Sequence, residues 1–523
     1  MSEIRVSDPE AVTSPIFRIK GQRSTPVYPD PRLTPEHCEI LRDVDIGQRG
    51  IVQSRFGYDT YNPTVLPSAE RALGMWQGKF SNGDEKQVIV TRTKVYSVTD
   101  SAAVDITGSN LVGGVDDRVQ MIFLKDQLIL NNSVDDPRVW AGNDTSPTNT
   151  ADLATIPFTK CESMVTHQNL LMALGTTEGG TYFPTRIRWC NVNRATYVVD
   201  INTWTDLDRY EIYDGGTAIV GAVDAWGWCM IFKTDGLYPG RIIYHPTGDY
   251  DFNLGDPTTE FGPRRGFSPI AKHSFISRPE FIFGVAKEGI FIIQPDFSFQ
   301  LVNSEDTEEW FGLNQDRLQY AQSYVLEDEH QVRTICSSAN NNNGHDYELV
   351  WDWDTGDVWI DRPSVKKSYA SRIVISGKEQ QWFGGVDGFM YKGGTSATTD
   401  DNGSSIDWRI KTAPNDLGSP GKLKHIVNVR TLYRKRAASV NVTVSVHLDE
   451  GRKSRVEDTL VTGAQHKWNT GVKWNQGNKW PGAPARRDDT FVNIMAETLA
   501  VEWSGSQPAS IEGYIVDYIP LEN

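Results

Sequence analysis

A short pattern recurs along the middle of this chain, between Val88 and Tyr391. Each copy is an apolar run of strand length, a tight turn built from Asp and Gly, and a second strand that carries an aromatic residue. Successive copies begin between 32 and 101 residues apart, and a repeat of about 50 residues is typical of a four-stranded unit that closes into a ring of blades. The copies are Gln127–Leu130 with Arg138–Trp140, Trp228–Phe232 with Leu237–Tyr238, Phe281–Ala286 with Ile290–Ile293, Leu349–Trp353 with Val358–Ile360, and Gln381–Phe383 with Phe389–Tyr391. The repeat predicts an all-β chain that contains a β-propeller of six or seven blades, because radial stacking buries both faces of each small sheet and protects its edges.

The chain divides into three regions. Residues 1–70 are Pro-rich and are expected to form an extended N-terminal lead-in that lies along another surface. The repeats assign residues 71–400 to the propeller. A stretch rich in Gly, Ser, Thr and Asp over 393–405 marks the end of this region.

The last region shows the alternation of a half-buried strand. In Val440–Val446 the valines fall on one face and the polar residues on the other. Further strands are expected at Leu499–Trp503 and Tyr514–Ile519. Residues 405–523 are therefore predicted to form a small C-terminal β-sandwich.

The composition of the chain argues against a membrane helix, a signal peptide and a disulfide framework. No stretch of the 523 residues reaches the roughly 18 consecutive apolar residues of a membrane helix, and the start of the chain has no apolar signal core. The protein is therefore expected to be made in the cytosol and to leave it only within an assembly. The five cysteines are scattered singly, which favours small buried hydrophobic residues over a disulfide framework or a zinc knuckle.

Charge is unevenly distributed along the chain. Residues 411–487 contain fifteen Lys or Arg against five Asp or Glu, a local net charge of +10. Because the whole chain carries −16, the remainder carries −26. An acidic body with a basic module indicates docking between copies of the chain or attachment to an acidic partner. The alternative is a solvated strand face that happens to be basic.

Signs of catalysis are few. The chain has no Gly-x-x-x-x-Gly-Lys-Ser/Thr loop, no His-Glu-x-x-His and no Gly-x-Ser-x-Gly. The nine histidines are dispersed without a second His or Cys at metal-ligand spacing. His167 and His273 are expected to lie in strands as satisfied core or turn residues. We therefore expect no enzymatic activity, no cofactor and no metal site.

Four acids near one turn are the best catalytic candidates: Asp352, Asp354, Asp357 and Asp361. Propeller glycosidases place paired acids at the mouth of the ring. The string from Asp352 to Trp359 resembles part of the sialidase Asp-box, with its Asp, Gly and Trp but without its Ser and Thr. That box is a hairpin turn, in which Asp caps the backbone and Gly supplies positive φ. A turn is therefore favoured, with a calcium loop and a catalytic pair as alternatives.

A Lys-Trp pair returns every sixth residue between Lys467 and Trp480. Even spacing keeps the tryptophans on one face of an extended segment. Rings interleaved with cations can stack on a neighbouring subunit, on sugars or on bases, or they can cover the edge of the sandwich. A subunit contact is favoured, and the candidate interface residues are Trp468, Trp474, Trp480, Lys473, Arg434, Lys435 and Arg436.

Several further segments, taken together, resemble those of a known protein family. They are an early strand followed by an Arg-x-Gly turn, two strand pairs, and a final β segment after the Trp-rich string: Leu41–Ile46 with Ser54–Tyr58, Gln127–Asn131 with Asp136–Trp140, Ala218–Gly221 with Ile231–Tyr238, and Val501–Tyr514. In this combination the chain resembles, over most of its length, the tail nozzle or tubular tail-accessory protein of short-tailed bacteriophages.

The resemblance implies a homo-oligomeric ring of six subunits in the virion tail, below the portal and adaptor proteins. Such a ring forms the distal conduit for genome ejection, through which double-stranded DNA passes transiently, and it docks tail fibres or spikes. The charge distribution agrees with this, because an acidic wall repels phosphate. The alternatives are a propeller-type carbohydrate-binding or glycoside-cleaving protein, such as a receptor-binding protein or depolymerase, and a generic scaffold propeller.

Overall fold

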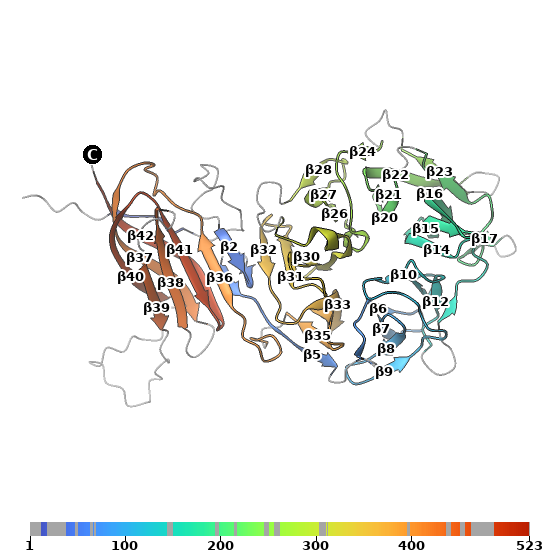
Figure 1. Ribbon diagram of the computed structural model, residues 1–523, viewed down its shortest axis with the longest axis horizontal. Coiled ribbons are helices and arrows are strands. Elements are labelled where there is room, and N and C mark those ends of the chain that lie inside the picture. Colours follow the sequence, from blue (N-terminus) through green and yellow to red (C-terminus); the bar gives the residue numbers. More distant parts are fainter. Residues whose placement is uncertain are drawn as a thin grey trace, which may run out of the picture.

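The structure, a computed structural model, is a ring of small sheets beside a two-sheet sandwich (Figure 1). It describes residues 12–17, 38–47, 51–62, 66, 69–143, 150–193, 198–213, 217–244, 250–255, 262–302, 310, 312–394, 398–435, 441–449, 456–461 and 486–521. The helical elements with described bounds are two short 3₁₀ helices, η2 (Lys272–Ser274) and η3 (Gln315–Tyr320). The prediction of an all-β chain is confirmed.

Seven units of four consecutively paired strands form the ring, so the predicted propeller has seven blades. Blade 1 comprises β6 (Gly74–Lys79), β7 (Glu85–Val90), β8 (Val95–Val98) and β9 (Ala103–Asp105). Blade 2 comprises β10 (Gln120–Leu124), β11 (Gln127–Asn131), β12 (Arg138–Trp140) and β13 (Ala151–Asp152). Blade 3 comprises β14 (Lys160–His167), β15 (Leu170–Glu178), β16 (Thr181–Trp189) and β19 (Arg209–Glu211), with the hairpin of β17 (Asn191–Asn193) and β18 (Val198–Asp200) before its last strand.

The second half of the ring follows the same plan. Blade 4 comprises β20 (Ile219–Ala225), β21 (Trp228–Lys233), β22 (Gly236–Tyr244) and β23 (Tyr250–Leu254), and β24 (Arg264–Arg265) pairs with β22. Blade 5 comprises β25 (Ile276–Ser277), β26 (Ile282–Ala286), β27 (Gly289–Ile293) and β28 (Phe299–Leu301). Blade 6 comprises β29 (Gln322–Leu326), β30 (Gln331–Cys336), β31 (Tyr347–Asp352) and β32 (Val358–Asp361). Blade 7 comprises β33 (Lys367–Ile375), β34 (Lys378–Gly385), β35 (Met390–Gly393) and β5 (Tyr58–Asn62).

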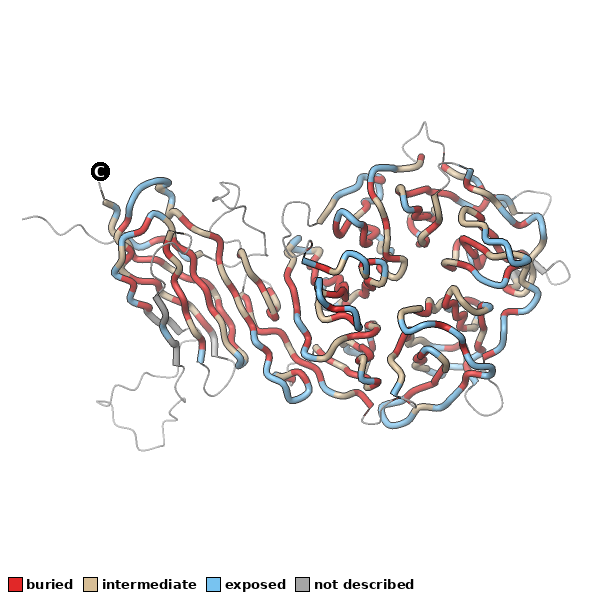
Figure 2. Tube along the Cα trace, in the orientation of Figure 1, coloured by how far each residue is buried: buried red, intermediate tan, exposed pale blue. Residues whose placement is uncertain are grey.

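The ring closes because the first strand of each blade contacts the first strand of the next, including β33 of blade 7 with β6 of blade 1. Strands such as β21 and β26 are almost continuously buried, since neighbouring blades cover both faces of their sheets (Figure 2). Their apolar runs therefore show no alternation. This is why the repeat is visible in the sequence as short, uninterrupted hydrophobic segments.

Blade 7 is completed by a strand from the start of the chain. β5 pairs antiparallel with β35, with Tyr58 opposite Gly393 and Thr60 opposite Tyr391. A strand from the far end of the sequence thus covers an edge that would otherwise expose unpaired backbone groups.

The sandwich consists of two sheets. The first sandwich sheet has the order β3 (Val44–Gly47), β4 (Ile51–Ser54), β42 (Ala509–Pro520), β37 (Lys424–Lys435) and β40 (Arg486–Ala496), with β1 (Val12–Thr13) also beside β42. The second sandwich sheet has the order β2 (Cys38–Arg42), β36 (Trp408–Thr412), β41 (Leu499–Gly505), β38 (Asn441–Leu448) and β39 (Val456–Val461). Between the sheets lies a core that includes the alternating Val442, Val444 and Val446, as predicted. The indole of Trp503 crosses this core and donates to Thr431 Oγ1 at 2.9 Å.

The region 1–70 was expected to be an extended lead-in along another surface, but its described part supplies strands to both domains. Its described strands β1 to β4 belong to the sandwich, and β5 belongs to blade 7. Residues 405–523 therefore supply only part of the sandwich. The propeller is inserted between the N-terminal and C-terminal strands of one sandwich.

Candidate functional site

The sandwich and the propeller share one continuous sheet. β2 pairs parallel with β32, the last strand of blade 6, with Arg42 opposite Ile360. The Asp43 amide donates to the Ile360 carbonyl at 2.9 Å. Nine strands from β29 to β39 therefore run without interruption from blade 6 through the second sandwich sheet (Figure 1).

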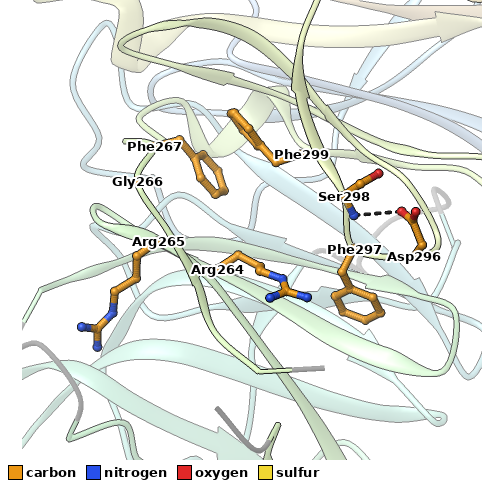
Figure 3. A pocket seen from close by; sticks show the side chains of 8 residues that line it. All are labelled: Arg264, Arg265, Gly266, Phe267, Asp296, Phe297, Ser298 and Phe299. Carbon is orange, nitrogen blue, oxygen red and sulfur yellow. Dashed lines mark hydrogen bonds between the residues drawn. The ribbon is translucent and has the colours of Figure 1, made fainter. Parts of the chain in front are cut away.

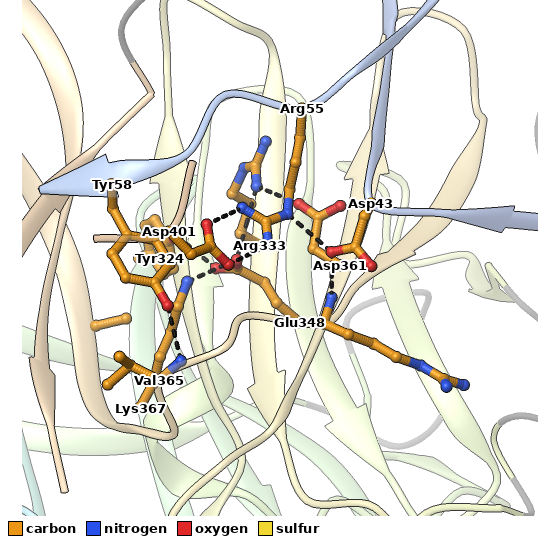
Figure 4. Close-up of polar contacts among 12 residues, drawn as sticks. Asp43, Arg55, Tyr58, Tyr324, Arg333, Glu348, Asp361, Val365, Lys367 and Asp401 are labelled. Carbon is orange, nitrogen blue, oxygen red and sulfur yellow. Dashed lines mark hydrogen bonds and ion pairs between the residues drawn. The ribbon is translucent and has the colours of Figure 1, made fainter. Parts of the chain in front are cut away.

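A buried ion cluster lies beside this shared sheet (Figure 4). Arg55 follows β4, where the chain passes from the sandwich to blade 7. Its Nε donates to Asp43 Oδ1 at 2.8 Å, and its two Nη atoms donate to the two carboxylate oxygens of Asp401 at 2.7 Å each. All three side chains are buried. Burial alone would lower the pKa of Arg55, but Asp401 and Asp43 raise it well above its usual value.

A second cluster continues from the first into blade 6. Arg333 of β30 donates to Asp361 Oδ2 at 2.9 Å and to Asp45 Oδ1 at 3.3 Å. Lys367 of β33 donates to Glu348 Oε2 at 2.7 Å. Burial opposes the ionisation of Glu348, but Lys367 and Arg333 outweigh it and lower the pKa of this carboxyl group. For Asp361, burial dominates and raises the pKa well above its usual value.

The return of the chain from the propeller to the sandwich is held by backbone hydrogen bonds. The amides of Gly57 and Tyr58 donate to the carbonyls of Thr398 and Asp400 at 2.9 and 3.1 Å, and the Asn402 amide donates to the Tyr58 carbonyl at 2.8 Å. The polar stretch over 393–405 therefore does mark a boundary. Its described part is hydrogen-bonded to the segment that leads from the sandwich into the propeller.

The turn at Asp352 has the geometry expected for a structural turn. Asp352 Oδ1 accepts from the amides of Asp354 and Thr355 at 2.9 and 3.1 Å, and the Gly356 amide donates to the Asp352 carbonyl at 2.8 Å. Gly356 has φ of +75°. This arrangement supports the turn interpretation over a catalytic one, because the carboxylate is occupied by its own backbone.

The four acids around that turn are not gathered at one point. Asp354 contacts His330 on the surface, whereas Asp361 is buried in the ion cluster at the junction. Within the ranges that the structure describes, no group of three His, Cys, Asp or Glu side chains could hold a metal ion. The role of Asp361 is not visible in the sequence, because it depends on Arg333 of β30, which is two strands away in the same sheet.

Most of the predicted interface residues lie outside the described residues. These are Trp468, Lys473, Trp474, Trp480 and Arg436. Arg434 and Lys435 belong to the end of β37, where their backbones pair with Ser510 and Ala509 of β42.

The outer face of the first sandwich sheet carries exposed apolar side chains. β40 is the last strand of this sheet, and along it Val492 and Ala496 point into the core. Phe491 and Met495 alternate with them and are 75% and 54% exposed. Large exposed apolar side chains on a sheet face are typical of a contact surface.

A shallow groove lies between blades 4 and 5 (Figure 3). It has a volume of about 410 Å³ and is lined by β24 and by the turn between β27 and β28. Phe267 and Phe299 stack in it with centroids 4.4 Å apart, beside Arg264 and Arg265. The groove combines aromatic and cationic groups but contains no pair of acids.

No protein-family model matches this chain, and no curated protein matches it. Among solved structures, the chain is similar to the Neurospora crassa Pan2 WD40 domain, with a TM-score of 0.38 and 11% sequence identity. The match covers 67% of this chain and 97% of that chain. In the part of the chain that the structure describes, no helix is long and apolar enough to cross a membrane.

Proposed function

We propose that this protein is a structural subunit of a ring-shaped assembly, and that the assembly is the tail nozzle of a short-tailed bacteriophage. The junction between propeller and sandwich carries the first part of the proposal. The second part rests on the sequence resemblance and on the charge distribution. In this role the protein would need no catalytic centre.

The junction supports a structural role because it makes one stiff body from two domains. Two chain crossings, one shared sheet and the buried Arg55 cluster all connect the same surfaces. Interfaces between domains of one chain commonly permit relative motion. Here the sheet hydrogen bonds and the bidentate pair oppose such motion, as a conduit wall would require.

The contact between subunits is assigned to the sandwich. The segment 411–487 carries +10 and the remainder −26. A second copy of the chain is therefore electrostatically complementary to this module. The exposed Phe491 and Met495 of β40 supply an apolar centre of the kind that interfaces between subunits use.

Electron microscopy of the purified full-length chain tests the proposal. We expect closed rings, with six copies as the resemblance implies, and we expect Phe491→Glu to shift the population toward monomers. Leu207→Glu is the matched control, because Leu207 is an exposed apolar residue of the propeller, at 88% exposure. Monomers at every concentration, with and without adaptor proteins, would contradict the proposal.

The carbohydrate-active alternative predicts a different result. A glycan array screen followed by product analysis would then show binding or turnover by the monomeric chain. Loss of that activity in Asp352→Asn would favour the alternative, because the nozzle proposal gives this residue only a role in a turn.

A further inference from the structure

A cavity of about 540 Å³ opens at one face of the propeller ring. Its walls are the segments that lead into β10, β20, β25 and β29 and the turns that follow β11, β21 and β26. Several blades thus contribute to one concave site. This is the place where a ring of radial sheets brings side chains from distant parts of the sequence together.

One wall of the cavity carries a buried guanidinium whose described partners are all neutral. Arg118 is 4% exposed. It donates to Gln322 Oε1 at 3.3 Å and to the Ser368 carbonyl at 3.0 Å, and it contacts His345 Nε2. Burial lowers the pKa of Arg118 to about 10. A guanidinium has five N–H donors, so these three contacts leave two for a ligand.

His345 is arranged to accept from Arg118 as a neutral imidazole. Its other ring nitrogen, Nδ1, lies 3.1 Å from Ser337 Oγ. Burial, together with Arg118 and Arg317, lowers the pKa of His345 well below its usual value. The contact therefore fixes the position of Arg118 and does not neutralise its charge.

The nearby carboxylates are engaged with other groups. Asp116 receives two hydrogen bonds from Arg317, at 2.7 and 3.2 Å. Asp117 Oδ2 accepts from the Gly114 amide at 2.6 Å, and Glu162 lies 3.7 Å from Lys272 Nζ. Among the described residues, Arg118 and Lys287 are thus the arginine and lysine side chains of this cavity that have no acid in contact with them.

A second observation concerns the wall of the same cavity. His273, in the 3₁₀ helix η2, lines the wall, and its Nε2 is buried without a hydrogen-bond partner in the described structure. This differs from the expectation of a satisfied histidine in a strand. Burial, Lys272 and Arg118 lower the pKa of His273, so its ring is neutral. An unpartnered buried polar atom is costly unless a ligand completes it.

We propose that this cavity binds the carboxylate group of a small organic molecule, with Arg118 as its counter-ion and His273 as a hydrogen-bond partner. A carboxylate group, which carries one charge, is favoured over phosphate because the neighbouring Asp116, Asp117 and Glu162 would repel a group that carries two negative charges on one centre. The site is independent of the proposed ring assembly.

Calorimetry and thermal unfolding of the full-length protein with succinate, acetate and inorganic phosphate test this proposal at constant ionic strength. We expect succinate to raise Tm more than phosphate does, and Arg118→Gln to weaken succinate binding about tenfold or more. Arg372→Gln is the control, since Arg372 is a half-exposed cation of blade 7 outside the cavity.

His273→Leu is the second variant, in case Arg118→Gln fails to fold. Removing the unpartnered nitrogen should leave Tm unchanged or higher without ligand, while succinate binding weakens. Equal succinate affinity in the wild type and His273→Leu would overturn the proposal. So would the lack of a Tm shift with any of the three anions, and a larger shift with phosphate would contradict the choice of a carboxylate.

Discussion

Arg55 and Asp401 are 346 positions apart in the sequence, yet the guanidinium of Arg55 donates two hydrogen bonds of 2.7 Å to the carboxylate of Asp401. Arg55 lies where the chain leaves the sandwich, and Asp401 lies where it returns. The pair therefore links the two segments in which the chain passes between the sandwich and the propeller. Asp43, which lies between β2 and β3, accepts a further hydrogen bond from Arg55 at 2.8 Å.

Replacing Arg55 with Met should destabilise the protein by about 3–5 kcal/mol, because Asp43 and Asp401 would remain buried without a counter-ion. Urea unfolding monitored by tryptophan fluorescence measures this loss. We also expect the transition to split in two, as the propeller and the sandwich become uncoupled.

The matched control is Arg372→Met. Arg372 pairs with Glu379 on the surface of blade 7 and is half exposed. Such pairs contribute about 1 kcal/mol or less. Similar losses in the two variants would show that the junction cluster does not hold the domains together.

A second prediction concerns the turn at Asp352. Asp352→Ala removes the acceptor for two backbone amides and should cost about 0.5–2 kcal/mol. Asp352→Asn retains an acceptor oxygen and should cost less. Gly356→Ala should cost about 1 kcal/mol through its positive φ alone, because an added Cβ would meet no atom within 4 Å. Thermal unfolding ranks the three variants by stability. If Asp352→Asn is as unstable as Asp352→Ala, this account of the turn is wrong.

A third prediction concerns acid stability. Burial opposes the ionisation of Glu178, but hydrogen bonds from Arg188 and Thr176 and the charges of Arg188 and Arg186 lower its pKa to about 2. The folded state therefore binds this proton less tightly than the unfolded chain does. The resulting stabilisation is complete above pH 4.5, the ordinary pKa of the group, and is lost as the pH falls toward 2.

Glu178→Gln should accordingly lower the unfolding free energy at neutral pH by on the order of 2–3 kcal/mol. The difference from the wild type should shrink as the pH falls, which urea titrations at several pH values can measure. Glu280→Gln is the control, because Glu280 is 60% exposed. If the difference in unfolding free energy between the wild type and Glu178→Gln does not change with pH, the titration of Glu178 is not its cause.

The blades could be predicted from the sequence because the strands and turns that define them are each encoded within a short stretch of the chain. Continuous apolar runs such as that in β21 and turns such as Asp352–Gly356 each lie within a few residues. The closure of blade 7 could not, since β5 is short and its partner β35 lies more than 300 residues away. Pairing at that distance leaves no periodic trace in the sequence of either strand.

The ion cluster and the cavity were invisible for a related reason. Arg55 lies in a turn-like segment and Asp401 in a polar stretch. From the sequence alone, each would be interpreted as a solvated surface residue. Arg118 shows no sign of burial until β10 is placed at the centre of a ring. Only the three-dimensional arrangement shows which charges lack a partner.

The last prediction concerns assembly through the sandwich. The string Lys467 to Trp480 supplies aromatic residues of the kind found at the centres of interfaces, within the segment that carries +10. Trp474→Ala should therefore weaken the ring by about 2 kcal/mol or more while the propeller stays folded. Mass photometry across a dilution series measures this, with Leu207→Ala as the matched control.

Salt should act on the same contact. Attraction between a basic module and an acidic body acts mainly on the rate of association, and the Debye length falls from about 10 Å at 0.1 M salt to about 3 Å at 1 M. Ring formation should slow accordingly. A chain cut near Gly403 is unsuitable for this test, because it removes β36 to β42 and so leaves β2 without β36 and β4 without β42. Point substitutions keep the sandwich whole, so rings of Trp474→Ala that form as fast and dissociate as slowly as those of the wild type would exclude the Trp-rich string from the subunit contact.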